Sequence, residues 1–246
     1  MLVYLGFDDT DDADAVMGTG RLAREFAHSL GNGFKVRGIV RHQLPRLADI
    51  PYTSNNSSAC ILVEASPDAS LDALRDQAAT HIASYCAPGS DPGLCVAEDS
   101  MVDAGIVDLA KNATAVRLTQ QAAMDAAGSV RLHGLGGSND GIIGAAAAVG
   151  LTCYGWCGRF IEYGALRDLP ATLRVQDLHQ AGIEVVSVDR DPLVPLNEHK
   201  ILGAAWLRPS LWAGRPVLQV KMVSHGVWEP AHGKRKKAHA AQVQTS

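Results

Sequence analysis

Long apolar runs, a second closely spaced cysteine pair and an excess of basic residues are all missing from this sequence. No stretch approaches the roughly 18 apolar residues that a membrane-spanning helix needs. The chain opens on an apolar, strand-like segment, so we expect neither a membrane span nor a secretory leader. Five scattered cysteines among 246 residues predict reduced thiols in a cytoplasmic protein. The formal net charge of −4 argues against a uniformly basic nucleic-acid binder but leaves local basic patches open.

Several familiar site signatures are also missing. The sequence has no G-x-x-x-x-G-K-[ST] phosphate loop, no histidine pair at metal-binding spacing, and no Ser-His-Asp set that we can nominate. Cys153 and Cys157 form a single C-x3-C pair, which we interpret as core thiols because a zinc site needs further ligands. A calcium loop starting at Asp8 fails, since Ala13 and Thr19 stand where such a loop needs Gly and Glu.

Alternating apolar segments and amphipathic segments predict an α/β (α+β) fold, with a mixed sheet flanked by helices. We expect a main part over residues 1–168, a smaller C-terminal α+β part over 169–230, and a basic disordered tail over 231–246. The expected strands span 1–7, 34–42, 59–64, 94–96, 152–166, 183–188 and 216–220. The expected helices span 19–31, 68–85, 103–127 with a break near Asn112, 142–149 and 175–182.

The most informative stretch follows the first predicted strand and reads Gly6-Phe7-Asp8-Asp9-Thr10-Asp11-Asp12-Ala13-Asp14. Its five aspartates repel one another unless water or a cation screens them. A metal ion, alone or with phosphates, is one explanation for such a cluster at the end of a buried strand. The alternative is a solvated acidic turn. We expect Asp12 and Asp14 to face water in either case.

Two glycine-containing stretches precede predicted helices. Gly18-Thr19-Gly20 lies too far past the strand for a dinucleotide-binding turn, but it opens a helix whose free N–H groups can face a phosphate. The alternative there is a plain helix start with Thr19 as N-cap. Residues 134–141 are rich in glycine and are either a second phosphate cradle or a simple turn. The hydroxyl-rich stretch 52–58 is a third candidate for contacts with phosphate or ribose.

Four segments of the sequence together resemble the archaeal agmatinylcytidine synthetase family, which modifies an isoleucine tRNA. Gly6-Phe7-Asp8-Asp9-Thr10-Asp11 with Met17-Gly18-Thr19 is similar to the family's opening "GIDDTDS…GMCTT". Ile50-Pro51-Tyr52 resembles its "IPYKTRGN", and Asp91-Pro92-Gly93 its "NPG". Residues 141–150 resemble its "G-x-IGA-x-AA-x-G". The four segments occur in register across residues 1–150.

The resemblance implies a kinase-like domain that binds ATP with Mg²⁺ and activates a nucleotide, an RNA base or a small molecule by phosphoryl transfer. It implies a ferredoxin-like character for the C-terminal part. Metal ligands would be Asp8, Asp9 and Asp11, and the same three with Thr19 would be catalytic. Nucleotide-binding residues would be Thr10, Gly18, Gly20, Gly136, Gly137, Ser138, Asn139, Asp140 and Gly141. Expected partners are ATP and a tRNA, small amine or nucleotide; a homo-oligomer stays open.

The sequence departs from the family's pattern at four positions. Gly18 and Gly20 replace a Cys and a Thr, while Thr53 and Asn55 replace a Lys and an Arg. The family's tRNA-binding OB-fold and zinc ribbon have no counterpart before residue 246. These departures leave two alternatives open: a non-catalytic nucleotide-sensing or RNA-associated module, and a tRNA-modifying enzyme whose partner supplies the RNA binding.

Overall fold

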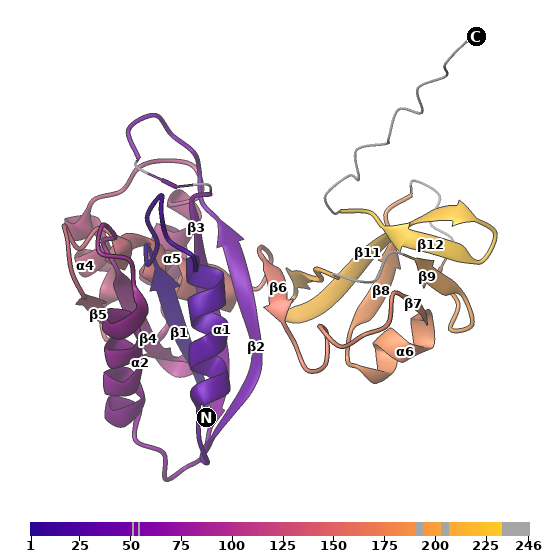
Figure 1. Ribbon diagram of the computed structural model, residues 1–246, viewed down its shortest axis with the longest axis horizontal. Coiled ribbons are helices and arrows are strands. Elements are labelled where there is room, and N and C mark those ends of the chain that lie inside the picture. The colour runs from indigo at the N-terminus through magenta and orange to yellow at the C-terminus, as the bar shows by residue number, and fades with distance from the viewer. Residues whose placement is uncertain (51, 54, 190–193, 203–206, 233–246) are drawn as a thin grey trace.

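The computed structural model describes residues 1–50, 52, 53, 55–189, 194–202 and 207–232. It is an α+β protein with two lobes joined along one mixed sheet (Figure 1). Over the described residues the main strand order is β5-β4-β1-β3-β2-β6-β10-β11-β12-β9-β7, and β8 pairs with β11 away from this path. The predicted fold class is therefore confirmed.

The N-terminal lobe contains five antiparallel strands, with order β5-β4-β1-β3-β2. The strands are β1 (Leu2–Asp8), β2 (Phe34–Gln43), β3 (Ser57–Ala65), β4 (Gly93–Glu98) and β5 (Arg131–Gly134). The helices are α1 (Thr19–Ser29), α2 (Leu71–Tyr85), α3 (Ala104–Asn112), α4 (Gln120–Ala127) and α5 (Gly141–Tyr154), with a 3-10 turn η1 (Asp99–Met101).

Helices cover both faces of this part of the sheet, which explains why β1 is apolar throughout. Leu5 and Phe7 pack on the side of α1 and α2, whereas Tyr4 packs on the side of α3, α4 and α5. The small-residue helix α5 lies close against the sheet, because a side chain at Gly6 would collide with the backbone carbonyl of Ala145. The close packing expected of this helix is confirmed.

The C-terminal lobe begins at β6 (Arg159–Glu162), which pairs with β2 on one side and β10 on the other. Its remaining elements are β7 (Thr172–Arg174), α6 (Val175–Gln180), β8 (Glu184–Ser187), β9 (Lys200–Leu202), β10 (Ser210–Trp212), β11 (Arg215–Ser224) and β12 (Val227–Pro230). A separate core surrounds the fully buried Trp228. A domain boundary near residue 168 and a ferredoxin-like character stay predictions.

The strand expected over 152–166 is wrong for most of its length. Helix α5 continues to Tyr154 and ends at Gly155, which adopts the left-handed conformation (φ 75°) typical of a helix C-terminus. Only the four residues of β6 are extended. Trp206 and residues 233–246 of the expected basic tail lie outside the described residues. The N–H of Ala231, at the expected start of the tail, donates to the carbonyl of Gln219 on β11. Within the described part of the chain, none of the helices combines the length and apolar character needed to span a membrane.

Candidate active site

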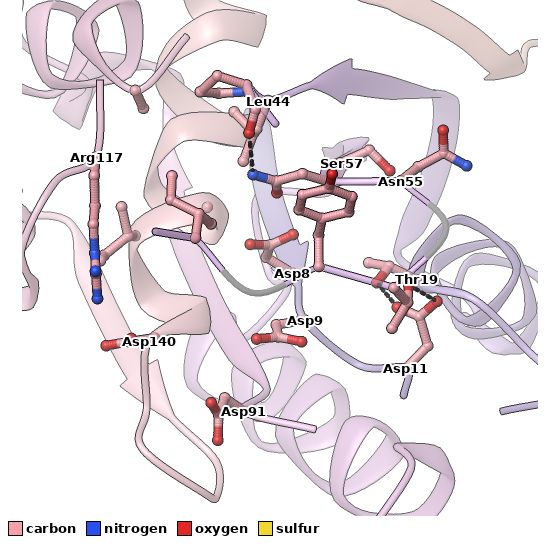
Figure 2. A pocket seen from close by; sticks show the side chains of 18 of the residues that line it. Asp8, Asp9, Asp11, Thr19, Leu44, Asn55, Ser57, Asp91, Arg117 and Asp140 are labelled. Atoms are coloured by element: carbon pink, nitrogen blue, oxygen red, sulfur yellow. Dashed lines mark hydrogen bonds between the residues drawn. The ribbon is translucent and has the colours of Figure 1, made fainter. Parts of the chain in front are cut away.

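The end of β1 and the loop after it form the floor of a cavity of about 340 Å³. Asp8 is the last residue of the strand, and Asp9 follows with a positive φ of 49°, a conformation that few non-glycine residues adopt. This turn brings the side chains of both residues into the cavity, as Figure 2 shows. Backbone strain of this kind gathers at functional sites, since packing elsewhere must hold it in place.

Two further carboxylates reach the cavity from distant parts of the chain. Asp91 precedes β4, and Asp140 directly precedes α5. Both interact electrostatically with Asp9 (Figure 2). The role of Asp91 was missed from the sequence because nothing local marks it. The sequence pointed to Asp91 only through the resemblance of the segment Asp91-Pro92-Gly93 to a family motif.

The gathered charges change how the two central carboxylates ionise. Burial raises the pKa of Asp8 to about 8, and the carboxylates of Asp9 and Asp11 add to this rise. Burial likewise raises the pKa of Asp9 to about 6, with further contributions from Asp91, Asp11 and Asp140. A cation in the cavity would favour the ionised forms.

Asp11 lies on the side of the cavity nearest α1 and contacts two hydroxyl groups. The Thr19 Oγ1 hydroxyl donates to Asp11 Oδ1 and the Thr53 hydroxyl donates to Asp11 Oδ2, each at 3.4 Å. Burial raises the pKa of Asp11, and these hydroxyls and the guanidinium of Arg41 oppose that rise. The buried Thr10 donates to Thr19 Oγ1 at 3.1 Å. Thr19 therefore binds side chains of the acidic loop; the helix N-cap is Gly18.

Gly144 on α5 makes room for the Asp8 carboxylate. Any side chain at this position would overlap the carboxylate of Asp8, so the helix can lie over the end of β1 only with glycine here. The predicted small-residue packing thus has a local consequence at the site. It leaves space for a partly buried acid between a strand and a helix.

The glycine-rich loop over 134–141 is held in place by Asp91. The Asp91 carboxylate accepts from the backbone N–H of Ser138 at 2.7 Å and from its hydroxyl at 2.8 Å. The backbone N–H of Gly141 donates to the carbonyl of Asp91 at 3.0 Å. Several of the loop's donors are thus used within the protein, and its role as a phosphate cradle stays a prediction.

The opposite wall of the cavity is different in character. It is largely apolar, with Arg117 beside it and a polar rim from the loop before β3. The apolar members are Leu44, Pro45, Ile50, Tyr52, Ala113, Val116, Leu118 and Ile143, and the polar rim contains Thr53, Asn55, Asn56 and Ser57. Arg117, which no sequence pattern singled out, lies 3.8 Å from the carboxylate of Asp49. The cavity therefore combines an acidic side with an apolar side.

The structure brings five of the predicted site residues to the cavity wall: Asp8, Asp9, Asp11, Thr19 and Asp140. Asp12 also lines the cavity and accepts from the N–H of Gly89 at 3.2 Å, a contact that the sequence did not predict. Asp14 is exposed as expected. The remaining predicted nucleotide-binding residues lie outside the lining: Thr10, Gly18, Gly20, Gly136, Gly137, Ser138, Asn139 and Gly141. A side chain at residue 20 would meet Ile161 of β6.

The protein matches solved structures over 61% of its length. It is 25% identical to TiaS in a complex with its isoleucine tRNA and ATP (TM-score 0.53) and 26% identical to a tRNA fluorescent labeling enzyme (TM-score 0.52). Apo TiaS, an agmatidine synthetase that acts on an isoleucine tRNA, is 24% identical with a TM-score of 0.52. The chain has a TiaS-like fold.

The match is partial in both directions. The chain spans about a third of the length of these proteins, 35% of apo TiaS and 36% of the other two. No model of a known protein family matches the sequence, and no curated protein does. The evidence for the TiaS-like fold is therefore the similarity to solved structures. The acidic cavity is the candidate active site within this fold.

Proposed function

We propose that this protein is a Mg²⁺-dependent, ATP-using enzyme of the TiaS kind. It transfers a phosphoryl group from ATP to a nucleotide base, an RNA base or a small molecule and so activates it. The observation that carries the proposal is the acidic cavity at the end of β1 in a TiaS-like fold. Structures with this fold include complexes of TiaS with ATP and with AMPCPP and agmatine.

The donors in the cavity fit Mg²⁺ bound together with phosphates. Among the described residues, no three His, Cys, Asp or Glu side chains are gathered into a ready-made metal cage. Mg²⁺ commonly uses only one or two carboxylates and takes its other ligands from water and substrate phosphates. Asp8 and Asp9 would hold the ion, which would neutralise charge on the transferred phosphoryl oxygens.

The other polar residues would position the reacting groups. The N-terminus of α1 at Gly18–Gly20 offers N–H groups to a phosphate, since Gly18 provides no side-chain cap. Asp11 would orient the metal-bound water or act as a base, and its contact with Thr19 holds it against the helix start. The apolar wall with Tyr52 suits a planar base, and the acidic side suits a cationic amine.

Isothermal titration calorimetry with Mg-ATP tests the proposal. The wild type is expected to bind, and Asp9→Asn to bind at least tenfold more weakly because a metal ligand is lost. Asp14→Asn removes the same charge from an exposed site in the same loop and is expected to bind like wild type. Equal binding by wild type and Asp9→Asn would exclude the metal assignment. Binding without phosphoryl transfer to agmatine, polyamines or RNA would instead support a nucleotide-sensing module.

A further inference from the structure

Arginines gather across three neighbouring strands beside the cavity. In the pairing of β2 with β6, Arg41 lies directly opposite Arg159, and Arg159 in turn lies opposite Ser210 of β10. Directly opposed residues of antiparallel strands point to the same face of the sheet, where like charges are destabilising. Arg208 stands two residues before Ser210 and interacts electrostatically with Arg41 and Arg159.

Helix α1 adds a fourth arginine to this group. Ile39 lies two residues before Arg41 on β2, and Ile161 lies two residues after Arg159 on β6, so each points to the same face of the sheet as its arginine. Both isoleucines pack in the core beneath α1. Arg24 of α1 lies on the same side and interacts with Arg208. We call Arg24, Arg41, Arg159 and Arg208 the arginine row.

Three members of the row lie apart from the described carboxylates. Within the described residues, no carboxylate lies within ion-pair distance of Arg24, Arg41 or Arg159. Glu162 interacts with Arg24, but it forms its ion pair with Arg167 at 2.9 Å. Burial and the neighbouring arginines together lower the pKa of Arg208 to about 10. A half-buried group of like charges is costly unless an anion binds to it.

The row begins at the cavity rim. The Arg41 guanidinium donates to the hydroxyl of Ser57 at 2.7 Å and 3.0 Å, and Ser57 lines the cavity. Arg41 also interacts with Asp11. From there the row leads away from the carboxylates across β6 towards β10. Guanidinium groups are suited to phosphate, since their fork of N–H donors matches its oxygens.

We propose that the arginine row is a binding site for the phosphate groups of a polyanion, adjoining the acidic cavity at its rim. The ligand is either a polynucleotide that presents a base to the cavity or a free polyphosphate. The first source rests on the proposed function, because it makes the acceptor a phosphate-bearing chain. The site itself does not depend on ATP or on a metal.

Fluorescence anisotropy with the full chain tests this site, using a labelled single-stranded RNA and inorganic polyphosphate as competitor. Arg159→Gln is expected to weaken binding of at least one polyanion about tenfold and to lower the slope of log affinity against log salt by about one. Arg131→Gln, which removes the same charge at the far edge strand β5, is expected to bind like wild type. The tighter of the two polyanions identifies the source.

The proposed site is wrong if neither polyanion binds, or if Arg159→Gln and Arg131→Gln lose affinity equally. Arg159→Gln is expected to be as stable as wild type, because it relieves the opposed pair with Arg41; should it unfold, Arg24→Gln on α1 serves as the same test. Asp9→Asn is expected to keep polyanion binding while it loses Mg-ATP. Failure of the proposed function and failure of this site are therefore distinguishable.

Discussion

Asp8 should make the metal-free protein less stable as the pH rises. Its pKa is about 8 in the folded protein, against 3.8 for an ordinary aspartate. Between these values the folded state holds one proton that the unfolded state has lost, so the free energy of unfolding falls with pH. One proton corresponds to about 1.4 kcal/mol per pH unit. The contribution of protonated Asp8 to the free energy of unfolding is fully present below pH 3.8 and is lost as the pH rises towards 8.

The substitution Asp8→Asn keeps the shape and removes the charge, so it removes this pH dependence. From pH 5 to pH 7 the full linkage is about 2.7 kcal/mol. Water in the cavity screens the carboxylate, so we expect the stability gain of Asp8→Asn over wild type to grow by about 1 to 3 kcal/mol over this range.

Urea denaturation at pH 5, 6 and 7, in the presence of a chelator and at constant ionic strength, measures this difference. Asp14→Asn is the matched control, because Asp14 is exposed in the same loop. Its difference from wild type should not change with pH. A gain for Asp8→Asn that is the same at every pH, or an Asn variant less stable than wild type at pH 7, would refute the reasoning about the buried carboxylate.

Three further predictions follow from the same geometry. Gly144→Ala should displace the Asp8 carboxylate, destabilise the protein by about 1 to 3 kcal/mol and weaken Mg-ATP binding in calorimetry, while Gly31→Ala, in open space, should change neither. Asp91→Ala should cost about 1 to 3 kcal/mol in urea denaturation, because Ser138 loses its two bonds to this carboxylate; a loss of less than about 0.5 kcal/mol would contradict that role. Mg²⁺ with a non-hydrolysable ATP analogue should raise the melting temperature more at pH 8 than at pH 6, since its carboxylate ligands must lose protons; an equal rise would argue against them.

The sequence predicts most elements of the N-terminal lobe because their patterns are local. The apolar spacing of Leu22 and Phe26 marks α1, and both residues are buried as that spacing requires. The small residues of α5 predicted close packing, and Gly144 shows why it matters at the site. The error over 152–166 has a local origin too. Tyr154 and the aromatic residues after it favour a strand, but helix α5 continues through Tyr154 and ends at Gly155.

Contacts between distant segments could not be read from the chain. Asp8 and Asp9 were recognised because they directly follow the strand predicted over residues 1–7. Asp91 joins them only because β4 lies beside β1 in the sheet. The opposition of Arg41 and Arg159 likewise depends on the register between β2 and β6, which no local pattern fixes.

A crystal structure of the protein with Mg²⁺ and a non-hydrolysable ATP analogue would show whether the acidic cavity is the ATP site. We expect density for the ion beside the carboxylates of Asp8 and Asp9, with the triphosphate between them and the start of α1. Nucleotide density elsewhere on the protein, or an empty cavity at saturating ligand, would contradict the assignment of this cavity as the ATP site.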